Sequence, residues 1–243
     1  MALVDWLVIR NRPADIGYSA FAWEEQPEVL SSPVLFRAIF ARKWVFVSGL
    51  AIAASVAAIA GTATWVVPAY IKVQNMPVES AALIGTTMGL SQVAFLVLGG
   101  YISDRMRKSV MVRLGAVLAL ATALLFTLAT IYPMSFSLLL LLAAVSGISV
   151  FSGGAVFSLL TEKYPISVAT GAVGYAEIFG MIASFLSPWI MGLALRETGG
   201  SFTHAVLAFS ALEVVLVAAL FLLAREPRFS KSYVTERDQV AIR

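Results

Sequence analysis

The chain of 243 residues has no cysteine and only one histidine, His204. Without a thiol it can form no disulfide, perform no thiol catalysis and bind no metal through cysteine. A single histidine excludes a His-rich metal site, and a Ser-His-Asp triad would have to use His204. The apolar segments also contain no pairing of a nucleophile with a base. We therefore expect no cofactor, no metal site and no enzymatic activity.

Charged residues are also scarce. They make up 13% of the chain, whereas a soluble domain carries about 25%. Hydrophobic residues account for 60%, and the mean hydropathy is +0.88. A membrane-spanning helix needs roughly 20 apolar residues, and six segments are that long: 44–71, 80–102, 110–130, 135–160, 168–195 and 202–224. The sequence thus predicts an all-α polytopic membrane protein with six transmembrane helices.

The positive charges are unevenly distributed between the two sides of these six segments. Fifteen of the 17 Lys and Arg residues fall on one side, and only Lys72 and Arg196 fall on the other. Basic residues near the ends of membrane spans stay in the cytoplasm, so we expect both termini to be cytoplasmic. The predicted organisation is a cytoplasmic linker-like arm at 1–43, a membrane domain at 44–224 and a cytoplasmic polar tail at 225–243.

The turn between the second and third segments holds the densest internal cluster of charge. It reads Gly99-Gly100-Tyr101-Ile102-Ser103-Asp104-Arg105-Met106-Arg107-Lys108. The pattern G-x-I-S-D-R-x-x-K resembles the loop signature of the major facilitator superfamily of secondary transporters, which has a second glycine where this chain has Arg107. The resemblance implies a cytoplasmic gate that includes Gly100, Asp104 and Arg105. The alternative is that these charges only set the topology.

Two further segments resemble the same family. Residues 160–171 are similar to the pattern T-E-x-F/Y-P-x-x-V-R-A-T-G, which adds Glu162 and Pro165 to the implied gate. The arginine of that pattern is absent here, so Arg105 or another cytoplasmic basic residue is a candidate partner for Glu162. Residues 10–17 resemble the R-x-R-P-x-D-x-G wording that follows the sixth helix in family members. For residues 160–171 the alternative is a proline-containing turn with a solvated glutamate. For residues 10–17 it is an ordinary polar arm. Together the segments imply the C-terminal half of such a transporter, six helices in two three-helix repeats.

The resemblance also implies that the first, second, fourth and fifth helices line a central path. On these helices we expect the path to include Trp65, Gln92, Tyr175 and Glu177. Glu177 lies roughly 13 Å into its segment at 1.5 Å per residue, and no Lys or Arg lies at that depth. An ionised carboxylate there costs about 2.5–3.5 kcal/mol. We therefore expect a water-filled path or a protonated side chain, both of which suit proton coupling. The alternative is a neutral glutamate that serves only packing.

Glu213 falls in the middle of the sixth segment, which the resemblance places outside the path. Two interpretations remain open. The side chain turns inward towards Thr122 and Thr127 of the third segment, or it marks a contact with another subunit.

The sequence thus predicts transport of a small solute, such as an organic anion or another metabolite, by alternating access of the major facilitator type. With proton coupling, the expected transporter is a symporter. Its expected location is a bacterial-type inner (plasma) membrane. The expected partners are membrane lipid, the solute and either a second six-helix half or a second copy in a homodimer. Nucleic acid is not an expected partner. The alternative function is a non-transporting six-span membrane subunit or an inactive truncated product.

Overall fold

The computed structural model of the protein describes residues 31–224. Within these residues the chain is helical, with no strand, and six helices are long and apolar enough to cross a membrane. The predicted all-α fold with six spans is therefore confirmed. The arm motif at 10–17 and the polar tail at 225–243 lie outside the described residues.

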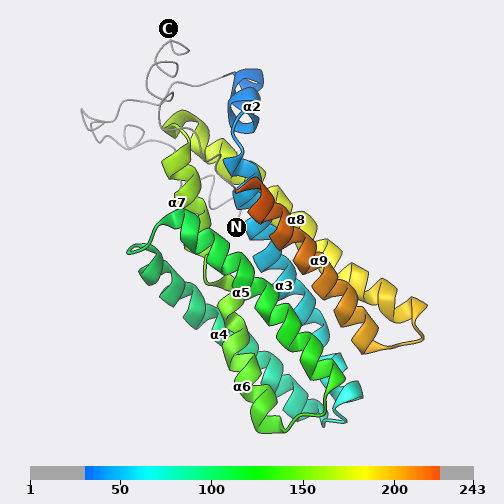
Figure 1. The fold of residues 1–243 in the computed structure, drawn as a ribbon. Helices are drawn as coiled ribbons and strands as arrows, with labels where there is room; N and C mark the ends of the chain where they lie inside the picture. Colours follow the sequence, from blue (N-terminus) through cyan, green and yellow to red (C-terminus); the bar gives the residue numbers. More distant parts are fainter. Residues whose placement is uncertain (1–30, 225–243) are drawn as a thin grey trace, which may run out of the picture.

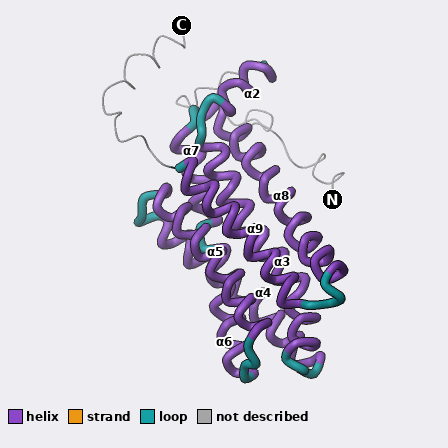
Figure 2. The backbone as a smooth tube through the Cα atoms, turned by 45° about the vertical axis from the view of Figure 1, so that its right-hand side comes forward, coloured by secondary structure: helices purple, strands orange, loops and turns teal. Residues whose placement is uncertain are grey.

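The six spans begin and end within a few residues of the predicted segments. They run back and forth along one long axis (Figures 1 and 2), so that their ends form two opposite faces. The fourth span is divided into α6, the 3₁₀ turn η2 and α7. The spans are α3 (Trp44–Val73), α4 (Val78–Ser103), α5 (Lys108–Ile131), α6–η2–α7 (Phe136–Ser146, Gly147–Val150 and Gly153–Lys163), α8 (Ile166–Glu197) and α9 (Phe202–Leu223).

A short additional helix, α2 (Ser32–Phe40), precedes the first span. The sequence predicts a linker at these residues, and no helix. Pro33 in the first turn favours helix initiation, and one apolar side of α2 packs against α8. Gly171 of α8 makes this contact possible, because a Cβ there would lie only 2.9 Å from Ile39 Cδ1. The face of the bundle that carries α2 is called the α2 end below, and the other face is called the α8–α9 end.

The first span, α3, lies at the centre of the bundle and packs against α8, α5, α9, α4 and α7. Its small residues allow this close packing. A Cβ on Gly49 would lie 2.7 Å from the ring of Phe179 in α8, and one on Gly61 would lie 2.7 Å from the ring of Phe209 in α9. The run of Ala and Gly in α3 therefore provides the space into which aromatic rings of two neighbouring helices fit.

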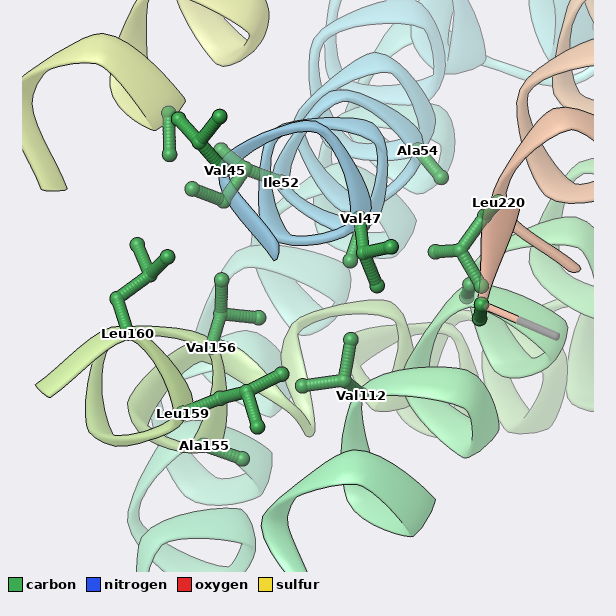
Figure 3. Packing of buried hydrophobic residues seen from close by; sticks show 14 of the residues in the cluster. Val45, Val47, Ile52, Ala54, Val112, Ala155, Val156, Leu159, Leu160 and Leu220 are labelled. Atoms are coloured by element: carbon green, nitrogen blue, oxygen red, sulfur yellow. The ribbon is translucent and has the colours of Figure 1, made fainter. Parts of the chain in front are cut away.

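A cluster of buried apolar side chains near the α2 end joins α3, α5, α7, α8 and α9, and part of it is drawn in Figure 3. Val45 and Val47 of α3 point towards α7, α5 and α9. Leu159 of α7, Val112 of α5 and Leu220 of α9 are each at most 1% exposed in this cluster. Between membrane-spanning helices, close van der Waals packing of such side chains favours association. This packing fixes the relative positions of the helices that carry the candidate site.

Candidate functional site

A cavity of about 370 Å³ lies between α3, α4, the η2–α7 part of the fourth span, and α8. These are the first, second, fourth and fifth spans, which the family resemblance assigns to the path. Most of the lining is apolar. The lining also includes polar or small residues, namely Ser55 of α3, Gly89 and Gln92 of α4, and Glu177 of α8. The cavity is thus an apolar space with one amide and one carboxyl group beside the Ser55 hydroxyl.

Gln92 and Glu177 bring these two polar groups to the middle of the bundle. Gln92 is near the centre of α4, and Glu177 lies roughly 17 Å along α8 at 1.5 Å per residue. Glu177 is only partly buried, and it forms no ion pair within residues 31–224. The amide offers both donors and an acceptor, whereas the carboxyl group binds a proton or a cation. The two side chains line one cavity from opposite helices.

Trp65 and Tyr175, the other two predicted path residues, are not among the residues that line this cavity. Trp65 Nε1 donates a hydrogen bond to the carbonyl of Pro188 in α8, at 3.1 Å. The ring of Tyr175 contacts α2, with ring centroids 5.8 Å from Phe36 and 5.1 Å from Phe40. The structure therefore brings two of the four predicted residues together and places the other two in contacts between helices.

The charged turn between α4 and α5 forms local contacts. Asp104 has a side chain that is 80% exposed and lies 3.5 Å from Lys108 Nζ. Arg105 folds back on the end of α4, donating to the carbonyl of Tyr101 at 3.0 Å and lying 3.7 Å above the Tyr101 ring. Glu162 is exposed and forms no ion pair among the described residues. The suggested pairing of Arg105 with Glu162 is not formed in this conformation, in which Arg105 contacts Tyr101.

Gly100 and Pro165, the other predicted gate residues, shape the helix ends. The Cα of Gly100 lies 4.0 Å from the position that a Cβ on Gly154 would take, so α4 and α7 approach closely there. Pro165 separates α7 from α8 with an extended backbone, φ −57° and ψ 152°. It lacks an N–H group and cannot continue a helix through the turn.

Tyr164 is not among the site residues predicted from the sequence. It connects the α2–α3 junction to the α7–α8 turn at the α2 end. Its hydroxyl lies 2.8 Å from the carbonyl of Ile39 and 3.1 Å from that of Arg42, and accepts from the Val45 N–H at 3.2 Å. Burial raises the pKa of the Tyr164 hydroxyl, and the Val45 hydrogen bond and the Arg42 charge offset this only in part. The hydroxyl therefore stays protonated at neutral pH and can donate. The signal available in the sequence is the aromatic position of the T-E-x-F/Y-P pattern.

Glu213 is fully buried and lies on the inner side of α9. Neither carboxyl oxygen has a hydrogen-bond partner among the described residues. The two threonines predicted as its partners bond elsewhere: Thr127 to Ser210 at 2.7 Å, and Thr122 to the carbonyls of Leu118 and Ser146. The inward orientation is thus present, but the predicted contacts with Thr122 and Thr127 are not formed.

Comparison with known proteins agrees with this arrangement. The crystal structure of a bacterial homolog of the human lysosomal transporter Spinster, inward-facing and unoccupied, superposes with a TM-score of 0.66 at 19% sequence identity. The match covers 92% of this chain and 56% of that one, so the chain spans little more than half the length of that transporter. No curated protein sequence matches the chain. The sequence model of the Major Facilitator Superfamily matches residues 2–188 and 50–241. The chain is therefore an integral membrane protein that belongs to the major facilitator superfamily.

Proposed function

We propose that the protein carries a small organic solute across a membrane by alternating access, together with protons that bind Glu177. The observation that carries this proposal is the shared cavity of Gln92 and Glu177 between α3, α4, α7 and α8. Its volume of about 370 Å³ is within the usual range for small-molecule sites, about 300–1,000 Å³. The apolar walls suit the carbon skeleton of a solute, and Gln92 suits its polar groups.

Proton coupling is supported by the position of Glu177. A carboxylate without a cationic partner is costly in the middle of a membrane, and Glu177 has no such partner within residues 31–224. The protonated side chain can enter a dry, closed state and can also donate a hydrogen bond to an organic anion. When the cavity opens to water on one side of the membrane, the proton can leave there. Binding of a proton and of an anion therefore assist each other, which is the requirement for a symporter.

Orientation follows from the basic residues. Arg42, Lys43, Arg107 and Lys163 lie at the α2 end, whereas the α8–α9 end of the described bundle carries Lys72 and Arg196. We assign the α2 end to the cytoplasm. On this assignment the Asp104 turn, Glu162 and Pro165 lie on the cytoplasmic side, where the proposed gate operates. A bacterial-type inner membrane is the proposed location.

A second six-helix unit completes the path in this proposal. The cavity has walls from one bundle only, and α4 and α8 are the two spans with the smallest buried share. Their exposed apolar residues include Leu90 and Val97 of α4 and Met181 and Phe185 of α8. A second copy or another half can cover these faces, and membrane lipid covers the remainder of the surface.

The test is reconstitution of the full chain in lipid vesicles that contain the pH-sensitive dye pyranine. A panel of carboxylates, amines and sugars is added outside, and a transported solute changes the internal pH. We expect Glu177→Gln to abolish the pH change. Glu197→Gln is the matched control because Glu197 lies at the exposed end of the same helix, beside Arg196. Equal responses of the two variants would contradict the role of Glu177, and a solute that enters without any pH change would contradict proton coupling.

A further inference from the structure

The fourth span is interrupted near its middle, between α6 and α7 (Figure 1). In a continuous α-helix, the N–H of Gly147 donates to the carbonyl of Ala143. Here the Gly147 N–H donates to the hydroxyl of Ser91 on α4, with 3.1 Å between N and Oγ. A side chain of the neighbouring helix therefore interrupts the backbone hydrogen bonds of the fourth span. Insertion of this kind is one of the established causes of a sharp kink.

Ser91 has two carbonyl acceptors for its single hydroxyl proton. Its Oγ lies 2.8 Å from Met88 O in α4 and 3.1 Å from Ala143 O in α6. A serine hydroxyl donates only one hydrogen bond, so Ser91 donates to one carbonyl at a time while it accepts from Gly147. Ser146 Oγ also donates to Ala143 O, at 2.8 Å. That carbonyl therefore stays paired when the Ser91 proton turns to Met88, and two arrangements with similar hydrogen bonding are available.

The packing around the break leaves no room for larger residues. A Cβ on Gly147 would lie 2.5 Å from the backbone nitrogen of Gln92, and Gly99 of α4 has no space for a Cβ beside the carbonyl of Phe151. From the other side, Thr122 of α5 lies 3.3 Å from the carbonyl of Ser146. The break is thus held by α4 and α5, and its position does not depend on local flexibility.

The break is directly connected to the candidate cavity. Gln92 follows Ser91 in the chain and lines the cavity from α4, while Gly153, Val156 and Phe157 line it from α7. A change in the angle between α6 and α7 therefore moves one wall of the cavity relative to Gln92. A 3₁₀ segment inside a helix often marks such a functional hinge.

We propose that Ser91 is a positioning residue whose inserted hydroxyl holds α7 at an angle to α6 and allows α7 to move between two orientations. In one orientation the Ser91 proton bonds Ala143 O and ties the two spans together. In the other it bonds Met88 O within α4 and the link to α6 weakens. The inference builds on the proposed transport function, because the moving α7 segment changes the cavity. Its hydrogen-bond basis, however, can be tested without any solute.

The test measures distances between spin labels in the full chain, which has no native cysteine. Labels on cysteines at Thr161 of α7 and Val110 of α5 report on α7, and both positions are exposed. Labels at Leu141 of α6 and Leu124 of α5, also exposed, report on the other half of the span. Double electron–electron resonance is recorded in lipid nanodiscs, with the melting temperature as a check that each variant is folded.

We expect two components in the 161–110 distance distribution of the otherwise unchanged protein. Ser91→Ala allows the Gly147 N–H to bond Ala143 O directly, so this distribution becomes a single, shifted component and the 141–124 distance stays the same. Ser158→Ala is the matched control, because that hydroxyl bonds only Gly154 O within α7, and both components should remain. An unchanged 161–110 distribution in folded Ser91→Ala would overturn the proposal. Equal shifts of both label pairs would also overturn it, because they indicate general loosening.

The transport readout separates this proposal from the proposed function. If the vesicle assay finds a solute, Ser91→Ala should change its KM together with the maximal rate, because the cavity wall is displaced. If Ser91→Ala moves α7 but no solute is found, the hinge stands and the proposed function fails. If a solute is carried and folded Ser91→Ala leaves α7 in place, the function stands and the hinge is refuted.

Discussion

The indole Nε1 of Trp65 donates a hydrogen bond to the carbonyl oxygen of Pro188 at 3.1 Å. This bond joins α3 to α8 in the half of the bundle nearer the α8–α9 end. The Trp65 ring also contacts the edge of Phe202 at the start of α9, with centroids 6.2 Å apart. Trp65 thus lies where three helices meet. In this conformation its role is to hold the α8–α9 end together, and its expected part in the solute path stays a prediction.

Trp65→Phe should lower stability modestly. The replacement keeps an aromatic ring and removes the hydrogen bond, which costs about 0.5–1.5 kcal/mol and lowers the melting temperature by about 2–4 °C per kcal/mol in a chain of this size. The measurement is thermal unfolding in detergent. Trp189→Phe is the control, because Trp189 is exposed and its ring contact within residues 31–224 is with Phe185 alone. Equal melting temperatures for the two variants would show that the Pro188 contact contributes nothing.

The proposed orientation predicts which labels reach which cysteines. A cysteine at Ser109, in the first turn of α5, should react with a membrane-impermeant maleimide only from the cytoplasmic side. A cysteine at Thr198, just after α8, should react only from outside. The reason is the excess of Lys and Arg at the α2 end. Reaction of the Thr198 position from the cytoplasm would contradict the orientation. A third position, Ser232, should label from the cytoplasm, but it lies outside the described residues.

Asp104→Asn should reduce transport while membrane insertion and stability stay normal. The ion pair with Lys108 is 3.5 Å long and its carboxylate is 80% exposed, so its loss costs at most about 1 kcal/mol. Any strong effect on transport must therefore come from a contact made in another conformation. The vesicle assay measures it, with Glu79→Gln at the opposite end of α4 as control. Wild-type transport by Asp104→Asn would leave the turn with a topological role only.

Much of the fold follows from the sequence, but the facing of individual side chains does not. Segment length and scarcity of charge identify all six spans, and the rare polar residues Gln92 and Glu177 both line the cavity. Trp65 and Tyr175 are harder to place, because apolar residues lie on every side of α3 and α8 and periodicity cannot show which face of the helix these two residues occupy. The break at Gly147 depends on the register of α4, which brings Ser91 beside it. Register between helices is a tertiary property that no single segment encodes.

Tyr164→Phe should destabilise the α2 end. The buried N–H of Val45 loses its acceptor and the carbonyl of Ile39 loses its donor, and an unpaired buried group costs about 1–3 kcal/mol. Because the pKa of Tyr164 is raised above its ordinary value of 10.0, the hydroxyl is neutral at both pH 6 and pH 8. The difference in melting temperature from the wild type should therefore be the same at these two values, and should shrink only as the hydroxyl ionises in strongly alkaline solution.

Tyr132→Phe is the matched control for that measurement. The Tyr132 side chain is exposed. Its hydrogen bonds within the described residues are made by the backbone, from its N–H to Leu128 O and to its carbonyl from Gln74. It should melt at the wild-type temperature. If Tyr164→Phe also melts there, the hydroxyl does not connect the α2–α3 junction to the α7–α8 turn.

Glu177→Gln should separate accumulation of the solute from exchange. Glutamine resembles the protonated carboxyl group in size and cannot release a proton, so a proton gradient can no longer drive uptake. Exchange of labelled for unlabelled solute needs no net proton movement and should persist. Both rates are measured in the same vesicles with the solute identified by the dye assay. Loss of both activities would assign Glu177 to solute binding or packing. Continued gradient-driven uptake would transfer the coupling role to another carboxyl group, and the buried Glu213 is the next candidate because no described group pairs with it.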